Sequence, residues 1–234
     1  MKIAVLMYGH MRTFKCCFNN LNKHLLSRID ADLFIHSWNT LESITPSWHT
    51  SHICHNRSVN ENEINLLYRP KFLRIDRQPI APKNINVVVD GVNLFGFRCM
   101  YYSLYAANRL RKKYEFEKGF KYDVVIKIRP DILLKSNFPT DLFDACQLNH
   151  IFFSGKKKRN FDISPRGYTA IDIINVTKAN TMDRLCSLYH EVDRYFHPDL
   201  RDKNGFVQYL DDKGVTLSRF DYHYDKDWYI LREQ

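Results

Sequence analysis

The chain has 234 residues, of which 44% are hydrophobic and 14% aromatic, a composition that supports a folded core and excludes an intrinsically disordered chain. No apolar run approaches the roughly 20 residues that span a bilayer, and the first apolar segment, residues 3–7, is too short for a signal-peptide core. We therefore expect a protein that stays in the cytoplasm. The net charge of +9 favours a polyanionic partner: nucleic acid, an anionic membrane surface or a phosphate-rich small molecule.

The domain organisation follows from the lack of a linker. No Gly/Ser-rich or Pro-rich stretch divides the chain, so we expect one domain over residues 1–234. Residues 39–60 are polar and irregular and are interpreted as an insertion, and residues 221–234 as an aromatic, charged C-terminal tail. None of the six cysteines forms a Cys-x-x-Cys pair, which favours free thiols.

The first 38 residues predict a strand, a helix and a second strand. Residues 2–9 are an apolar run closed by glycine, apolar residues at helical spacing follow Thr13, which we expect to cap the helix, and Ala31–Trp38 is again strand-like. Such a unit implies parallel strands and a right-handed crossover. The loop from Gly9 to Arg12 then lies at the carboxyl end of the first strand, where free backbone N–H groups and the Arg12 charge favour an anion.

The next part of the chain predicts a short helix over Glu61–Tyr68, strands over Phe72–Asp76 and residues 85–90, and a long helix over residues 94–114. Asp90 ends the second of these strands. The basic residues at the end of the long helix are interpreted as a solvated helix terminus, where cations favour the helix dipole.

The stretch over residues 119–135 has the most unusual charge pattern. Its apolar strand places Lys127, Arg129 and Asp131 at every second position, and residues two apart on a strand share a face. Pro130 cannot donate to a sheet ladder and therefore marks the end of regular pairing. The strand is expected to deliver Arg129 and Asp131 to the carboxyl edge of the sheet, where ligands of open α/β sheets bind.

The remainder predicts further strands and helices in alternation. A short helix is expected over residues 141–145, strands over residues 150–155, 171–176 and 215–220, and helices over residues 178–192 and 204–213. The fold class is therefore α/β, with a mostly parallel central sheet flanked by helices.

Three strand ends could form one site: the Gly9 to Arg12 loop, Asp90, and the pair Arg129 and Asp131. Cations, carboxylates and backbone N–H groups at one edge suit a diphosphate, with or without a divalent cation. The alternative is that Arg129 and Asp131 simply pair with each other. A P-loop, a dinucleotide fingerprint and a nucleophile elbow are all absent from the sequence.

Several segments resemble, in order, a group of bacterial and viral surface-polysaccharide glycosyltransferases. They are KIAVLMYGHMRTF at residues 2–14, DLFIHSW at 32–38, YDVVIKIRPD at 122–131, IDII at 171–174 and HPD at 197–199. The resemblance implies a single Rossmann-like, GT-A-like domain that uses a nucleotide-diphosphate sugar.

The resemblance also implies roles for individual residues. Such folds carry an Asp-x-Asp whose carboxylate holds Mn²⁺ or Mg²⁺ on the diphosphate; here Asp131 has the second acidic place and Arg129 the first, which leaves metal dependence open. His223 is either a second metal ligand or a surface histidine. If the reaction inverts, it needs a carboxylate base, for which Asp172 is the first candidate and Asp199 the second; Asp172 could instead be a structural acid.

The expected partners are a nucleotide-sugar donor and a glycan or lipid-linked acceptor. The basic residues 156–159 either approach a membrane peripherally or form a solvated loop. The rival hypothesis is a non-enzymatic, basic α/β domain that binds nucleic acid or another polyanion. Because the basic residues form no single stripe, we expect no nucleic acid. A transferase fold that has lost activity is the third possibility.

Overall fold

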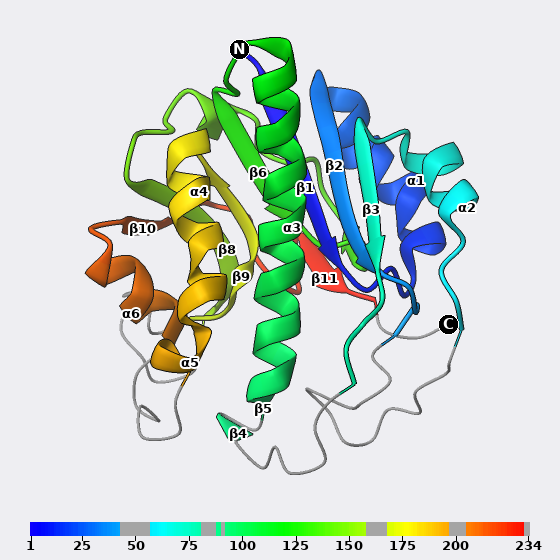
Figure 1. The fold of residues 1–234 in the computed structure, drawn as a ribbon. Helices are drawn as coiled ribbons and strands as arrows, with labels where there is room; N and C mark the ends of the chain where they lie inside the picture. The colour runs from blue at the N-terminus through cyan, green and yellow to red at the C-terminus, as the bar shows by residue number, and fades with distance from the viewer. Residues whose placement is uncertain (43–56, 81–87, 90–91, 158–167, 197–204, 232–234) are drawn as a thin grey trace.

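The computed structural model describes residues 1–42, 57–80, 88–89, 92–157, 168–196 and 205–231 (Figure 1). Its centre is a seven-stranded sheet in the order β10-β8-β9-β6-β1-β2-β3. Strands β1, β2, β3 and β6 run parallel, β10 runs parallel to β8, and β9 is antiparallel to both of its neighbours. The expected α/β class with a mostly parallel sheet is confirmed.

The N-terminal unit consists of β1 (Ile3–Gly9), α1 (Phe14–His24), a 3₁₀ turn (Leu26–Arg28) and β2 (Ala31–Trp38). Strands β1 and β2 pair in parallel, as predicted. Thr13 is the N-cap residue of α1, as expected, but its side chain makes no capping hydrogen bond. Its Oγ1 instead donates to the carbonyl of Leu231, 2.7 Å away, and ties α1 to the C-terminal segment.

The next elements are α2 (Glu61–Tyr68) and β3 (Phe72–Asp76), both with the predicted bounds. The side chain of Asn60 caps α2 by accepting from the N–H groups of Asn62 and Glu63. Of the predicted strand 85–90, the structure describes Val88–Val89, which forms the short strand β4. It pairs with β5 (Val92–Asn93) and not with the central sheet.

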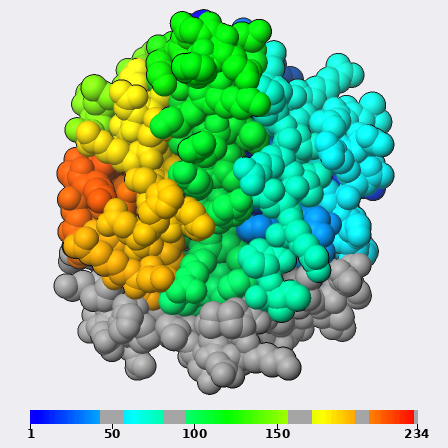
Figure 2. All heavy atoms as spheres, in the orientation of Figure 1, coloured from blue at the N-terminus to red at the C-terminus, as the bar shows by residue number. Residues whose placement is uncertain are grey.

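Helix α3 (Leu94–Lys118) lies across one face of the sheet and is four residues longer than predicted. In the space-filling view its green atoms occupy the middle of this face from top to bottom (Figure 2). The interpretation of its basic end as solvated was wrong for Arg111, which is fully buried between Glu115 and Asp183, at 2.5 Å from each. Gly119 ends the helix with a φ of +67°.

Strand β6 (Val124–Ile128) lies beside β1 and is completely buried. Beyond Pro130 the chain forms β7 (Ile132–Leu134), which pairs antiparallel with β11 (Trp228–Ile230). The predicted tail is therefore part of the fold. Trp228 is fully buried, and its Nε1 donates to Ser154 Oγ at 2.5 Å.

The second half contributes β8 (His150–Lys157), β9 (Tyr168–Thr177) and β10 (Thr216–Arg219) to the sheet. The predicted 141–145 helix is a 3₁₀ turn, Asp141–Phe143. The predicted 178–192 helix is divided into α4 (Ala179–Cys186), a 3₁₀ segment (Ser187–Glu191) and α5 (Val192–Tyr195). Helix α6 (Gly205–Asp212) ends before Gly214, whose φ is +65°.

Two apolar clusters cover the two faces of the sheet. One joins α3, α4 and α6 to β1 and β6, and the other joins α1 and α2 to the opposite face of the same strands. Lys127 extends from β6 toward the first cluster, where it bonds β9, while Ile126 and Ile128 belong to the second, as the alternating pattern predicted. Among the helices of the described residues, none is long and apolar enough to cross a membrane.

Candidate functional site

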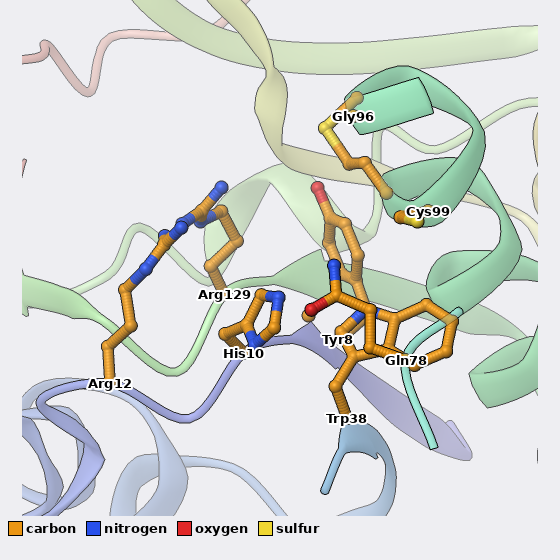
Figure 3. Close-up of a pocket in the computed structure, with 10 residues that line it drawn as sticks. Tyr8, His10, Arg12, Trp38, Gln78, Gly96, Cys99 and Arg129 are labelled. Atoms are coloured by element: carbon orange, nitrogen blue, oxygen red, sulfur yellow. The ribbon is translucent and has the colours of Figure 1, made fainter. Parts of the chain in front are cut away.

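A pocket lies at the carboxyl ends of β1, β2 and β6, next to the first turns of α3 (Figure 3). Its cavity volume is about 40 Å³, and it is partly open to solvent. Strand β1 is the point where the strand order reverses, because β2 follows it on one side and β6 lies on the other. In open α/β sheets the connections diverge at such a point and leave a crevice for ligands.

The pocket lining comes from four parts of the chain. These are the end of β1 and its loop (Tyr8, Gly9, His10, Arg12), the ends of β2 and β3 (Trp38, Gln78), α3 (Gly96, Cys99, Met100) and the end of β6 (Arg129). In Figure 3 the two arginines lie on one side, Trp38 and Gln78 lie on the other, and His10 lies between them. One side of the pocket is thus cationic and the other largely apolar.

The cationic side is built on Asp131, a fully buried carboxylate held by two arginines. Arg129 Nε lies 2.8 Å from Oδ1 and Arg129 Nη2 lies 2.6 Å from Oδ2. Arg12 Nη1 lies 2.9 Å from the same Oδ2. Two guanidinium ions and one carboxylate leave this cluster with one net positive charge.

Both arginines keep N–H groups for a further partner. Arg129 Nη1 and the Nε and Nη2 atoms of Arg12 make no hydrogen bond to any described residue. Burial opposes the charge on Arg129, but Asp131 outweighs it, so the pKa of Arg129 is raised. At Arg12 burial dominates and the pKa is lowered, although Asp131 offsets part of that effect. Arg12 also has a φ of +34°, a conformation that is strained for a residue with a side chain.

The metal ion implied by the resemblance does not fit the described residues. Both oxygens of Asp131 accept from guanidinium groups, and His223 bonds Asp221, with its Nε2 2.5 Å from Oδ1, and contacts Arg219. His223 does not line the pocket, and none of the described lining residues is acidic. Among the described residues no group of three or more His, Cys, Asp or Glu side chains could hold a metal ion.

His10 is neutral and is fixed in one tautomer. Its Nδ1 lies 3.0 Å from the carbonyl oxygen of Thr40, so Nδ1 carries the proton and Nε2 is an acceptor. Burial and then the charge of Arg12 lower the pKa of His10 to about 3. It is therefore a weak general base at neutral pH but is suited to accept a hydrogen bond from a ligand.

The apolar side of the pocket is held by aromatic packing. Trp38 stacks on Tyr102 at a centroid distance of 5.5 Å, and His36 packs edge-on against both rings. Trp38 is 3% exposed, so only a small part of its surface is accessible to a ligand in the pocket.

A buried hydrogen-bond chain positions the Gly9 loop. The Gly9 N–H donates to Ser103 Oγ at 2.7 Å, Ser103 lies 2.7 Å from His36 Nδ1, and His36 Nε2 lies 3.1 Å from Asp76 Oδ2. These residue types match a nucleophilic triad, but Ser103 is fully buried and its oxygen already accepts from Gly9. The chain is therefore structural, and it orients the loop that carries His10 and Arg12.

Two of the backbone N–H groups in the loop are already bonded within the protein. The Gly9 N–H is bonded to Ser103, and the Arg12 N–H donates to the carbonyl of Leu41 at 2.9 Å. The Arg12 side chain, rather than these two N–H groups, is what the loop presents to an anion.

Lys127 and Asp172 lie next to the pocket. The Lys127 ammonium bonds the Asp172 carbonyl and Asn175 Oδ1, and Tyr8 donates to the same carbonyl at 2.9 Å. Burial lowers the pKa of Lys127 to about 8, although the charge of Asp172 offsets part of the shift. Because β9 runs antiparallel, its first half reaches the carboxyl edge of β6, and this brings Asp172 to the site. No described residue bonds the carboxylate of Asp172.

The sequence located part of this site. Gly9, Arg12, Arg129 and Asp131 come together as expected, Lys127 lies beneath the pocket, and Asp172 lies beside it. Asp90 and Asp199, like the basic residues 158 and 159, lie outside the described residues. His10, Trp38 and the residues of α3 were not among the predicted site residues. Arg12 was selected because it lies at the carboxyl end of a parallel strand, and His10 and Trp38 also lie at such strand ends.

No model of a known protein family matches the chain, and a search of the curated proteins finds no significant match. We therefore infer the function from the fold and from the geometry of the pocket.

Proposed function

We propose that this protein is a glycosyltransferase that moves a sugar from a nucleotide-diphosphate sugar to a glycan or lipid-linked acceptor in surface-polysaccharide synthesis. The observation that carries the proposal is the pocket at the reversal point of the sheet, where Arg12 and Arg129 have N–H groups that bond to no described residue. A mostly parallel sheet with its ligand pocket at the carboxyl edge also supports the GT-A-like assignment.

The two sides of the pocket match the two parts of a nucleotide sugar. Arginine guanidinium groups recognise phosphate oxygens in pairs, so the diphosphate binds at Arg12 and Arg129. The nucleoside then occupies the side formed by Trp38, Cys99 and Met100. Ligand pockets combine apolar walls with a few polar groups in this way.

Glycosyl transfer breaks the bond between the anomeric carbon and the diphosphate oxygen and forms a bond to an acceptor hydroxyl. The two arginines stabilise the negative charge that develops on the leaving diphosphate, which is usually the largest catalytic contribution of such a site. In an inverting reaction Asp172 accepts the proton of the attacking hydroxyl. Its carboxylate suits this role because no described residue bonds it and because it lies beside the pocket. Asp199 remains the second candidate.

A melting-temperature panel tests the proposal. UDP-, GDP-, CMP- and dTDP-sugars are added singly, and a nucleotide sugar that raises the Tm is then assayed for release of its nucleotide in the presence of glycan and lipid-linked acceptors. Stabilisation by one nucleotide class together with acceptor-dependent release supports the proposal. Stabilisation by RNA or DNA alone, measured alongside by a gel-shift assay, supports the rival polyanion-binding domain.

A further inference from the structure

We infer that the site binds the donor diphosphate directly through Arg12 and Arg129, without a divalent metal ion between protein and phosphate. This inference rests on the proposed function and concerns how the same pocket recognises its substrate. It departs from the metal use that the sequence resemblance implies at Asp131 and His223.

The first argument is the state of the Asp131 carboxylate. A metal-binding carboxylate presents a free oxygen lone pair to the ion at about 2.0–2.6 Å. Asp131 is fully buried, and its two oxygens accept three charged hydrogen bonds of 2.6–2.9 Å from Arg129 and Arg12. A dication at either oxygen would lie next to two guanidinium ions, and like charges at such distances in a buried site repel strongly.

The second argument is the lack of other ligands. Each described residue that lines the pocket is neutral or cationic. Among these described residues, His10 and Cys99 are the two of a type that commonly binds metals. His10 offers a single nitrogen, Nε2, because its Nδ1 donates to the Thr40 carbonyl, and burial raises the pKa of the Cys99 thiol to about 11, which disfavours the thiolate that binds metals. A divalent cation would therefore find few oxygen ligands among the described lining residues.

The third argument is that the two arginines can supply the positive charge that a metal ion would supply to the phosphate oxygens. A bridging metal supplies positive charge to the phosphate oxygens, and the cluster of Arg12, Arg129 and Asp131 supplies one net positive charge with directional N–H groups. Arg129 Nη1 and Arg12 Nε and Nη2 are available for this, since no described residue accepts from them. Asp131 then acts by holding two mutually repelling guanidinium groups at the rim.

Calorimetric titration of the full chain tests the inference. UDP, GDP, CDP and dTDP are titrated into the protein in EDTA and, separately, with Mg²⁺ or Mn²⁺. We expect one of these nucleoside diphosphates to bind in EDTA, with a Kd within about threefold of its value with metal. Binding that requires the metal, or that is at least tenfold tighter with it, overturns this inference and leaves the proposed function standing. Lack of binding under both conditions overturns both.

His223→Ala provides a second measurement in a residue outside the pocket. We expect this variant to bind the same nucleoside diphosphate with unchanged affinity in EDTA and with metal. A loss of affinity confined to the samples with metal would identify His223 as a metal ligand and overturn the inference.

Discussion

Arg129 and Asp131, two residues apart at the end of β6, form a two-point ion pair in which Nε and Nη2 of the arginine hold both carboxylate oxygens, at 2.8 and 2.6 Å. From the sequence, pairing of Arg129 with Asp131 was the alternative to a phosphate-binding site. The structure adds Arg12 from the β1 loop to the same carboxylate. Two arginines and one aspartate give the cluster a net charge of +1, which can attract an anion.

Replacing Arg129 tests the role of this cluster in binding. Arg129→Gln is expected to weaken binding of the nucleoside diphosphate by about 10- to 100-fold, because a hydrogen bond to a charged group contributes roughly 1.5–3 kcal/mol. Isothermal titration measures the change. Arg98→Gln is the matched control, since Arg98 also forms a two-point pair, with Asp193, but this pair is exposed and Arg98 does not line the pocket. Equal losses in the two variants would contradict the assignment.

Asp172→Asn separates catalysis from donor binding. If Asp172 is the base of an inverting transfer, the substitution lowers turnover by about 10²- to 10⁴-fold, while donor affinity changes little. Steady-state rates and titration of the donor check the two expectations, with the exposed Asp144→Asn as the control. Near-wild-type turnover in Asp172→Asn would remove this residue from the mechanism.

Acid should destabilise the fold through His10 and His36. Burial lowers the pKa of these side chains to about 3 and about 4, so in the folded state they stay neutral where the unfolded chain, with its ordinary pKa of 6.5, takes up protons. The free energy of unfolding is therefore highest above pH 6.5. It decreases as the pH falls below 6.5, by roughly 1 kcal/mol per pH unit for each histidine.

Urea unfolding between pH 7.5 and 5.5 measures this slope. His10→Asn should reduce the slope by about half, whereas the exposed His190→Gln should leave it unchanged. An unaltered slope in His10→Asn would show that His10 is not held neutral.

The C-terminal segment is expected to be essential for stability. Trp228→Ala removes a fully buried side chain and its hydrogen bond to Ser154, which should lower the free energy of unfolding by about 3–5 kcal/mol. Phe116→Ala is the control, because Phe116 is 89% exposed and its loss should change stability by less than about 0.5 kcal/mol. Chemical denaturation compares the two variants, and a small effect at Trp228 would mean that β11 is not part of the stable fold.

The sequence was most informative where local pattern alone determines structure. The predicted bounds of β2, α2 and β3 match the structure because each of these segments is apolar on a regular period and is closed by a clear stop, such as Arg69-Pro70 after α2. Glycines mark two helix ends in the same local way: Gly119 follows α3 and Gly214 lies just beyond α6, and both adopt a positive φ.

Long-range pairings were not accessible from the local pattern. Strand β7 is only three residues long, and its partner β11 lies more than ninety positions away, in the segment interpreted as an aromatic, charged tail. The burial of Arg111 has the same origin, because Asp183 on α4 is 72 positions distant. In the site, the charge pattern of β6 indicated Arg129 and Asp131, but only the fold shows that Arg12 reaches the same carboxylate.

A crystal structure of the protein with the nucleoside diphosphate that binds most tightly in EDTA tests the central claim most directly. We predict that phosphate oxygens lie within about 3 Å of Arg129 Nη1 and of Arg12 Nε or Nη2, that the nucleoside contacts Trp38, and that Asp131 keeps both arginines. A diphosphate bound elsewhere, or one coordinated by a metal ion that Asp131 holds in place of the arginines, would contradict the account.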